Sequence, residues 1–349
     1  MKPLIVASTR EAAGKTSLCV GLARTVGKRV GYFKPLGDRP LYQKKRLWDY
    51  DASLLYRLLK LDVEPEALSL GFDHSKLRYM YDDESILEAL RERIEEVGAG
   101  RDGVLIESGR NLSFGASIRL DPLTISQLTG YPVLIVAGGD DQSIMDDLAF
   151  VKRFVGTDEA TVAGVIINRV EHVDDFRQTH LPQIEAMGIG VLGLVPYQES
   201  LGARTVTMIA DRLFARVLTG ENQMARPVRD VLVGAMSVDA AMSAEIIARP
   251  DNMVITSGDR SDMIMAAIDA GGTSAIVLTN NIVPPPNVIA HAADAGTPLL
   301  LVPGDTYAVA LQVERIESIL TEMEDPRIDT LANLTEKHVD IEAITQLLA

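Results

Sequence analysis

Near its N-terminus the chain carries the stretch Leu4-Ile5-Val6-Ala7-Ser8-Thr9-Arg10-Glu11-Ala12-Ala13-Gly14-Lys15-Thr16-Ser17. Four apolar residues typical of a buried strand come first, then a short loop, then a helical pattern expected over Ser17–Val26. Polyphosphates bind where backbone N–H groups meet a helix N-terminus, with a lysine across the phosphates and a hydroxyl on Mg²⁺. Gly14-Lys15-Thr16 supplies these groups, so the stretch predicts a phosphate-binding loop, although Thr9 stands where a leading glycine is usual.

The first two hundred residues alternate short β-branched runs with helical patterns. This alternation is typical of a parallel sheet with helices on both faces, the α/β fold of P-loop NTPases. The expected strands are Leu4–Ala7, Val30–Phe33, Val104–Ile106, Val133–Ala137, Val162–Ile167 and Val191–Val195.

A second, smaller α/β domain is expected after Pro227. Its expected strands are Val231–Gly234, Met253–Thr256, Ala275–Thr279 and Leu299–Val302. Before Pro227, a helical pattern ends at Gly220 and the polar residues that follow it, which are typical of a linker. We therefore expect a P-loop domain over 1–204, a linker helix over 205–226, a second domain over 227–325 and a C-terminal tail over 326–349.

Composition narrows the class of protein. A length of 349 residues favours two domains, and 47% hydrophobic residues is ordinary for globular chains. The net charge of −15 argues against nucleic-acid and anionic-membrane partners. The single cysteine, Cys19, favours a reducing compartment. Because the N-terminus resembles no signal peptide and no run of 18 apolar residues occurs, we expect a cytoplasmic protein.

A nucleotide site of this kind also needs an acid for Mg²⁺ at the end of a neighbouring strand. Glu107 directly follows the expected strand Val104–Ile106 and is the first candidate. A second acid is provided by Asp49 or Asp51, on either side of Tyr50. Spacing alone leaves open which of these two aspartates faces the metal.

These motifs resemble dethiobiotin synthetase over about the first two hundred residues. The matching segments are Thr9 to Thr16, Gly31-Tyr32-Phe33-Lys34-Pro35, Asp51, Glu107, Asn168-Arg169 and Leu192-Gly193-Leu194-Val195-Pro196. The resemblance implies that ATP and Mg²⁺ are the cofactors and that Lys15 and Lys34 are the catalytic cations, with Lys34 in the γ-phosphate site. The implied metal ligands are Thr16, Asp51 and Glu107, and Asn168 and Pro196 would border the adenine. The implied nucleotide contacts are Thr9, Arg10, Ala13, Gly14, Lys15, Thr16 and Ser17.

Two departures from that family put its substrate in doubt. Gly37-Asp38 replaces a small hydroxyl residue, and Glu107 is followed by Ser108-Gly109-Arg110-Asn111 in place of a small-residue run. We expect nucleotide binding to be retained and the substrate to differ. Arg10 occupies the position where partition-type ATPases carry a lysine that reaches across a dimer, and it is either such a residue or a solvent-facing loop arginine. A homodimer is expected.

The second domain contains Ser257-Gly258-Asp259-Arg260-Ser261-Asp262 at the end of an expected strand. This run resembles the signature of the DRTGG domain, which follows a dethiobiotin-synthetase-like domain in long phosphotransacetylases and in shorter stand-alone proteins. Gly258, Asp259, Arg260 and Ser261 form either a ligand site for an anion or ribose, or a helix cap with local pairing. Because little chain follows this domain, acetyltransferase activity is not expected.

Three classes of function remain. The first is a regulatory Mg-ATP-binding protein whose second domain senses a small metabolite. The second is an ATP-dependent synthase or ligase that activates a carboxylate or carbamate, as dethiobiotin synthetase or a cobyrinate amide synthase does. The third, an adaptor without nucleotide binding, is disfavoured by Lys15, Thr16 and Glu107.

Overall fold

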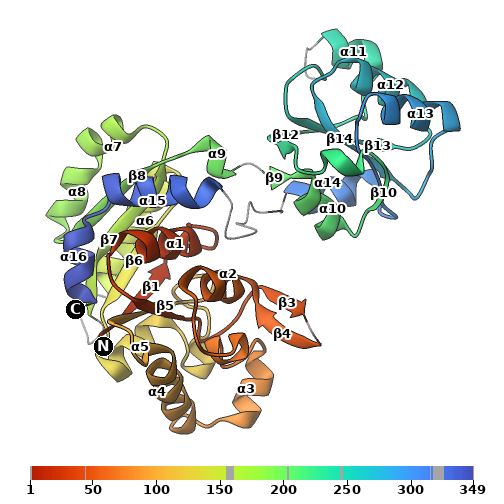
Figure 1. Ribbon diagram of the computed structural model, residues 1–349. Coiled ribbons are helices and arrows are strands. Elements are labelled where there is room, and N and C mark those ends of the chain that lie inside the picture. The colour runs from red at the N-terminus through yellow and green to blue at the C-terminus, as the bar shows by residue number, and fades with distance from the viewer. Residues whose placement is uncertain are drawn as a thin grey trace. The chain divides into compact units, whose positions relative to one another are not determined.

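The computed structural model describes residues 2–43, 45–154, 161–202, 204–243, 247–314, 316 and 326–348. The chain forms two compact units, Met1–Gln198 with Leu320–Ala349, and Glu199–Ile319. Each unit has its own α/β sheet (Figure 1). Among the helices of these residues, none combines the length and apolar character needed to cross a bilayer.

The first unit is built on a six-stranded sheet in the order β2-β5-β1-β6-β7-β8. Every neighbouring pair in it is parallel. The strands, in sheet order, are Val30–Phe33, Gly103–Glu107, Lys2–Ser8, Val133–Ala137, Val162–Val170 and Val191–Pro196. All six predicted strands are confirmed. The central strands are buried along most of their length, because helices cover both faces of a parallel sheet.

The helices of the first unit follow the apolar periodicity of the sequence. In α4, for example, Ile86, Leu90 and Ile94 are buried at helical spacing. The α-helices before the second unit are α1 (Lys15–Thr25), α2 (Tyr50–Leu59), α3 (His74–Met80), α4 (Ser85–Gly98), α5 (Pro122–Thr129), α6 (Asp141–Phe154), α7 (Val173–Thr179) and α8 (Leu181–Ala186). A hairpin of β3 (Pro40–Gln43) and β4 (Arg46–Asp49) precedes α2. Short 3-10 turns span Pro65–Leu68 and Ala116–Ile118.

The C-terminal segment belongs to the first unit, so the prediction of a separate tail over 326–349 is wrong. Helices α15 (Pro326–His338) and α16 (Ile341–Leu347) pack there, α15 against α1 and β8. A Cβ on Gly21 of α1 would lie 2.0 Å from the Thr335 hydroxyl oxygen, so the missing side chain allows the close approach. The predicted boundary at residue 325 lies outside the described residues.

The second unit is built on a five-stranded sheet in the order β10-β15-β14-β13-β12. The strands, in sheet order, are Arg216–Thr219, Leu299–Leu301, Thr273–Thr279, Asn252–Ser257 and Asp230–Val233. The last four are parallel and were predicted, and β10 is antiparallel to β15. A two-stranded ribbon pairs β9 (Arg204–Thr205) with β11 (Pro227–Val228).

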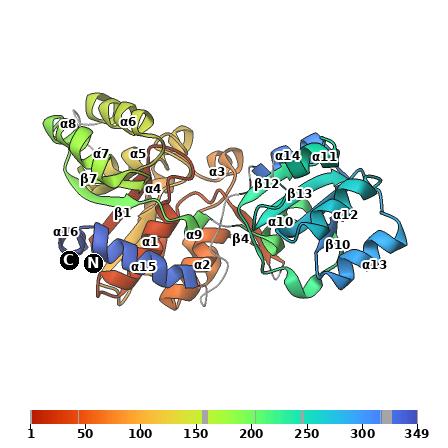
Figure 2. The same cartoon turned by 90° about the horizontal axis from the view of Figure 1, so that it is seen from above.

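Helices cover both faces of the second sheet (Figure 2). On one face, Val254 of β13 packs with Ile264 of α12 and Ala292 of α13. On the other face, Met253 of β13 packs with helices α10 and α14. The helices of this unit are α9 (Glu199–Gly202), α10 (Val206–Leu213), α11 (Val238–Ser243), α12 (Ser261–Asp269), α13 (Pro286–Asp294) and α14 (Thr306–Glu314), with a 3-10 turn at Glu221–Gln223.

The prediction of a linker helix over 205–226 is wrong. Val206, Ile209 and Leu213 place the apolar face of α10 in the core of the second unit. The helix ends where Phe214 adopts a left-handed conformation (φ 50°), and the chain continues into strand β10. The apolar residues of 216–219 are therefore packed as an edge strand rather than as a helical turn.

Candidate functional site

The predicted phosphate-binding loop connects β1 to α1 at the carboxyl edge of the first sheet. Ala12 (φ 60°) and Gly14 (φ 98°) both adopt left-handed backbone conformations. Asn168 Nδ2 donates to the Ala13 carbonyl at 2.8 Å, and a Cβ on Gly14 would lie 2.2 Å from the same nitrogen. Glycine at position 14 is thus favoured by its φ angle, and it leaves room for the Asn168 side chain. Asn168 braces the loop, and its predicted place beside adenine stays a prediction.

Lys15 is buried within the loop that it is predicted to serve. Its Nζ donates to Ser8 Oγ at 2.7 Å and to the Arg110 carbonyl at 3.2 Å. Burial lowers the pKa of Lys15, and the nearby Glu107 carboxylate opposes that shift. Both contacts are neutral oxygens, which an anionic phosphate can replace with a stronger, charge-assisted hydrogen bond.

The predicted metal ligands Thr16 and Glu107 come together, which places a hydroxyl beside a carboxylate. Thr16 Oγ1 donates to Glu107 Oε1 at 2.8 Å, and the Tyr32 hydroxyl donates to Glu107 Oε2 at 2.8 Å. Burial, followed by the charge of Asp51, raises the pKa of Glu107 to about 6. Oxygen donors of this kind suit Mg²⁺, so the residues fit the implied metal.

Tyr32 has a contact that the sequence analysis missed. Its ring is fully buried on β2, and β2 pairs with the strand that ends at Glu107. A signal for this contact exists, because Tyr32 and Lys34 lie two residues apart and a strand places such residues on one face.

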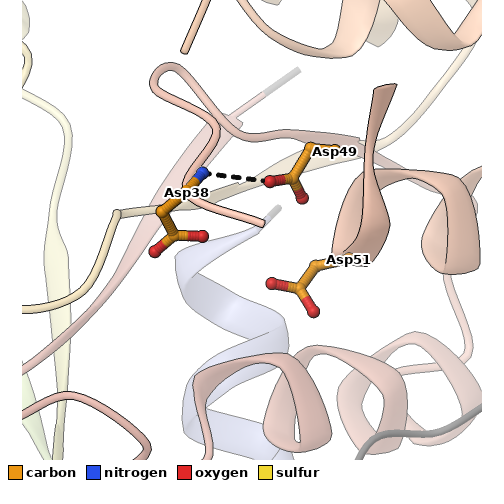
Figure 3. A group of neighbouring side chains, drawn as sticks. All are labelled: Asp38, Asp49 and Asp51. Atoms are coloured by element: carbon orange, nitrogen blue, oxygen red, sulfur yellow. Dashed lines mark hydrogen bonds between the residues drawn. The ribbon is translucent and has the colours of Figure 1, made fainter. Parts of the chain in front are cut away.

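Lys34 lies in a cluster of three aspartates, Asp38, Asp49 and Asp51. Its Nζ contacts an oxygen of Asp38, Asp51 Oδ2 at 2.6 Å and Asp49 Oδ1 at 3.4 Å. Burial disfavours the ammonium, but the surrounding carboxylates outweigh it and raise the pKa of Lys34 well above its ordinary value. Figure 3 shows the three carboxyl groups facing a common space. The cation among them is the lysine ammonium.

The two aspartates that the sequence left unresolved have different roles. Asp49 is the N-cap of α2: it accepts from the backbone of Ala52, Asp38 and Arg39 at 3.1 Å. Burial raises the pKa of Asp49. The pKa of Asp51 is lowered, because Lys34 and Arg39 together outweigh its burial. Since these two cations contact its oxygens at 2.6 and 3.3 Å, the role of Asp51 as a metal ligand stays a prediction.

Arg10 forms a bidentate ion pair with Asp147 of α6, at 2.7 and 3.1 Å. A contact across a dimer stays a prediction. Ser17 lies in the first turn of α1, which begins at Lys15 rather than at Ser17 as predicted, and Pro196 ends β8.

In the second unit, Arg260 pairs locally. Its guanidinium donates to both oxygens of Asp262 at 2.9 and 3.1 Å and to the carbonyls of Gly234 and Met236. A Cβ on Gly258 would lie 1.8 Å from the Ile282 carbonyl oxygen, so glycine allows the two loops to touch. Asp259 is exposed, Ser261 begins α12, and a ligand site at these residues stays a prediction.

The fold and the loop geometry define a P-loop NTPase-type α/β protein with a second α/β unit. The family described as AAA domain matches residues 2–205, and the DRTGG domain matches residues 208–316. The chain belongs to the AAA domain family and carries a DRTGG domain after it.

Curated relatives confirm the resemblance to phosphotransacetylases. The chain is 26% identical over 368 residues to phosphate acetyltransferase of Nitrosomonas europaea, covering 99% of this chain and 52% of that protein. It is 25% identical over 378 residues to the enzyme of the same name from Pseudomonas aeruginosa, with 99% and 52% coverage. The chain thus spans about half the length of these relatives.

Two solved structures are similar over parts of the chain. One is the MinD cell division protein of Aquifex aeolicus, with 16% identity, a TM-score of 0.36, and coverage of 58% of this chain and 84% of that one. The other contains the CBS and DRTGG domains of the regulatory region of Clostridium perfringens pyrophosphatase, with 17% identity, a TM-score of 0.29, and 38% and 60% coverage.

Proposed function

We propose that the protein binds ATP with Mg²⁺ at the carboxyl edge of its first sheet and acts as a regulatory nucleotide-binding protein. One observation carries the proposal: the buried Lys15 ammonium contacts only neutral oxygens among the described residues, next to the paired Thr16 and Glu107. Lys15 would hold the β- and γ-phosphates, and Thr16 with Glu107 would hold Mg²⁺. The ion would neutralise phosphate charge.

Binding with little turnover is favoured over the synthase alternative. In a synthase of this fold, a cation must stabilise the phosphoryl group while a carboxylate or carbamate attacks it. Here the Lys34 ammonium is already surrounded by Asp38, Asp49 and Asp51. An anionic second substrate would meet these carboxylates and be repelled. The dethiobiotin-synthetase resemblance therefore supports nucleotide binding more strongly than it supports that family's reaction.

The DRTGG unit is proposed to sense a small metabolite. Its parallel strands β13 and β14 end at one edge of the sheet, where α/β sheets commonly bind ligands. There Thr279 and Thr306 share a hydrogen bond of 2.8 Å, and Thr279 pairs with Ser257, which directly precedes the Gly258 to Ser261 segment. A cytoplasmic homodimer in which this unit affects nucleotide binding completes the proposal.

Calorimetry and phosphate release test the proposed function on the full chain. We expect saturable binding of ATP that weakens at least tenfold when EDTA removes Mg²⁺, and a phosphate-release rate that added carboxylic acids leave unchanged. A carboxylic acid that accelerates phosphate release would replace the regulatory proposal with the synthase. Absence of ATP binding at millimolar nucleotide would leave the adaptor class.

A further inference from the structure

The turn that follows β5 brings Arg110 against the phosphate-binding loop. The Arg110 carbonyl accepts from Lys15 Nζ at 3.2 Å and from Ser8 Oγ at 3.3 Å. A lysine of this loop type extends across the β- and γ-phosphates, so its Nζ marks the far end of a bound triphosphate. The backbone of Arg110 therefore lies beside the position that the terminal phosphate would take.

The side chain of Arg110 rests on an aromatic platform. Its guanidinium carbon lies 5.4 Å from the centre of the Phe114 ring, and His74 packs edge-on against that ring at 5.2 Å. A Cβ on Gly109 would lie 2.0 Å from Phe114 Cδ1, so glycine allows the ring to close against the turn. A cation over a ring face is attracted by the ring, and this contact uses none of the guanidinium N–H donors that could bind an anion.

The acid that contacts Arg110 belongs to the phosphate-binding loop itself. Arg110 Nε lies 3.6 Å from Glu11 Oε1, a distance too long for a hydrogen bond, and both side chains are at least half exposed. The neighbouring cations are held more tightly, because Arg10 is paired with Asp147 at 2.7 Å and Lys34 lies among three aspartates. A phosphate competes for Arg110 against one loosely placed carboxylate.

We propose that Arg110 binds the terminal phosphate of the nucleoside triphosphate and that Glu11 competes with this phosphate for the guanidinium. The proposal rests on the proposed function, since it needs a nucleotide in the loop. It makes Arg110 a specificity residue that distinguishes a triphosphate from a diphosphate. An arginine is suited to this, because its planar donors match phosphate oxygens in pairs.

Two substitutions with opposite expected effects test the proposal by calorimetry with MgATP and MgADP. Arg110→Ala should raise the Kd of ATP about tenfold, the size of one lost charge-assisted interaction, and change the Kd of ADP by less than about twofold. Glu11→Gln should lower the Kd of ATP about threefold, because the competing charge is removed. The double variant should have the same Kd values as Arg110→Ala, because in this proposal Glu11 affects ATP binding only through Arg110.

Arg119→Ala is the matched control. Arg119 follows in the same connection, is 43% exposed and also has one ion pair, to Asp83 at 3.0 Å. It should leave both Kd values unchanged, which separates a specific contact from a general loss of positive charge. Equal weakening of ATP and ADP by Arg110→Ala, or unchanged ATP affinity, would overturn the inference. In either case, ATP binding by the unsubstituted protein would leave the proposed function standing, whereas its absence would refute the proposed function itself.

Discussion

The carboxyl edges of the two sheets differ in the kind of polar side chain that they bury. At the first edge five charged side chains are each at most 7% exposed, those of Lys15, Lys34, Asp49, Asp51 and Glu107. At the second edge the buried polar groups are neutral threonines such as Thr256 and Thr279, and the charged Arg260 is 32% exposed.

This difference indicates what each edge is built to do. A buried charge costs several kcal/mol unless it is paired, so a cluster of such charges is favoured where a charged ligand will complete it. Burying hydroxyl groups is much cheaper when they are hydrogen-bonded, as Thr279 is to Thr306. This difference supports the proposal that the first edge binds a polyanion with a metal ion and that the second binds a neutral or weakly charged metabolite.

The largest expected effect comes from breaking the charge cluster of the first edge. Lys34→Met removes the cation from Asp38, Asp49 and Asp51 while keeping most of the side-chain volume. We expect the free energy of unfolding to fall by about 3–5 kcal/mol, the usual cost of leaving buried charges unpaired. Urea unfolding followed by Trp48 fluorescence measures this, since Trp48 is the only tryptophan and lies in the first unit. A loss below about 1 kcal/mol would show that the cluster is not electrostatically important.

A smaller effect is expected in the pH dependence of stability. The pKa of Glu107 is about 6 in the folded protein against an ordinary value of 4.5, so the folded state holds more protons between these values. The folded state therefore loses stability as pH rises from about 4.5 to 6, by ~2 kcal/mol at 1.36 kcal/mol per pKa unit.

Glu107→Gln cannot titrate at this position and should lack this pH-dependent loss. The measurement is urea unfolding at a series of pH values without nucleotide or Mg²⁺. If the substituted and unsubstituted proteins had parallel pH profiles between 4.5 and 6, the Glu107 carboxyl would not be the titrating group.

The smallest effect is expected at the second edge. Arg260→Ala removes a partly exposed ion pair with Asp262 and hydrogen bonds to the Gly234 and Met236 carbonyls. Because solvent screens the ion pair and can replace these hydrogen bonds, we expect a loss of about 0–1 kcal/mol. Hydrogen exchange of the β13 and β14 amides should report a loss within that range. A loss as large as that of Lys34→Met would mean that the two edges do not differ as described.

Much of the fold follows from local patterns in the sequence. Every strand predicted in the two sheets is present, because each is a short apolar run between turn signals. The errors lie where distant packing decides. The helix α10 was predicted as a linker because its apolar face packs against a sheet formed by later segments of the chain. The helix α15 was predicted as part of a tail because its main contact, with α1, joins the two ends of the chain.

The candidate site, like the fold, was predictable where local sequence patterns decide and not where distant contacts decide. Lys15, Thr16 and Glu107 were identified because each lies at a strand end or a helix start, where spacing is informative. The contacts of Arg110 were not, because its carbonyl meets Lys15 across 95 residues of sequence. The aspartates around Lys34 were likewise known as residues, but their geometry depends on how the hairpin of β3 and β4 folds back.

The affinity of the Lys15→Ala protein for MgATP tests the central claim most directly. Calorimetry should show the Kd of ATP raised at least about a hundredfold, with the far-UV circular dichroism unchanged, while Arg119→Ala binds ATP like the unsubstituted protein. If the folded Lys15→Ala protein bound ATP as tightly as the unsubstituted protein does, the phosphate would not lie in the loop between β1 and α1, and the account would be wrong.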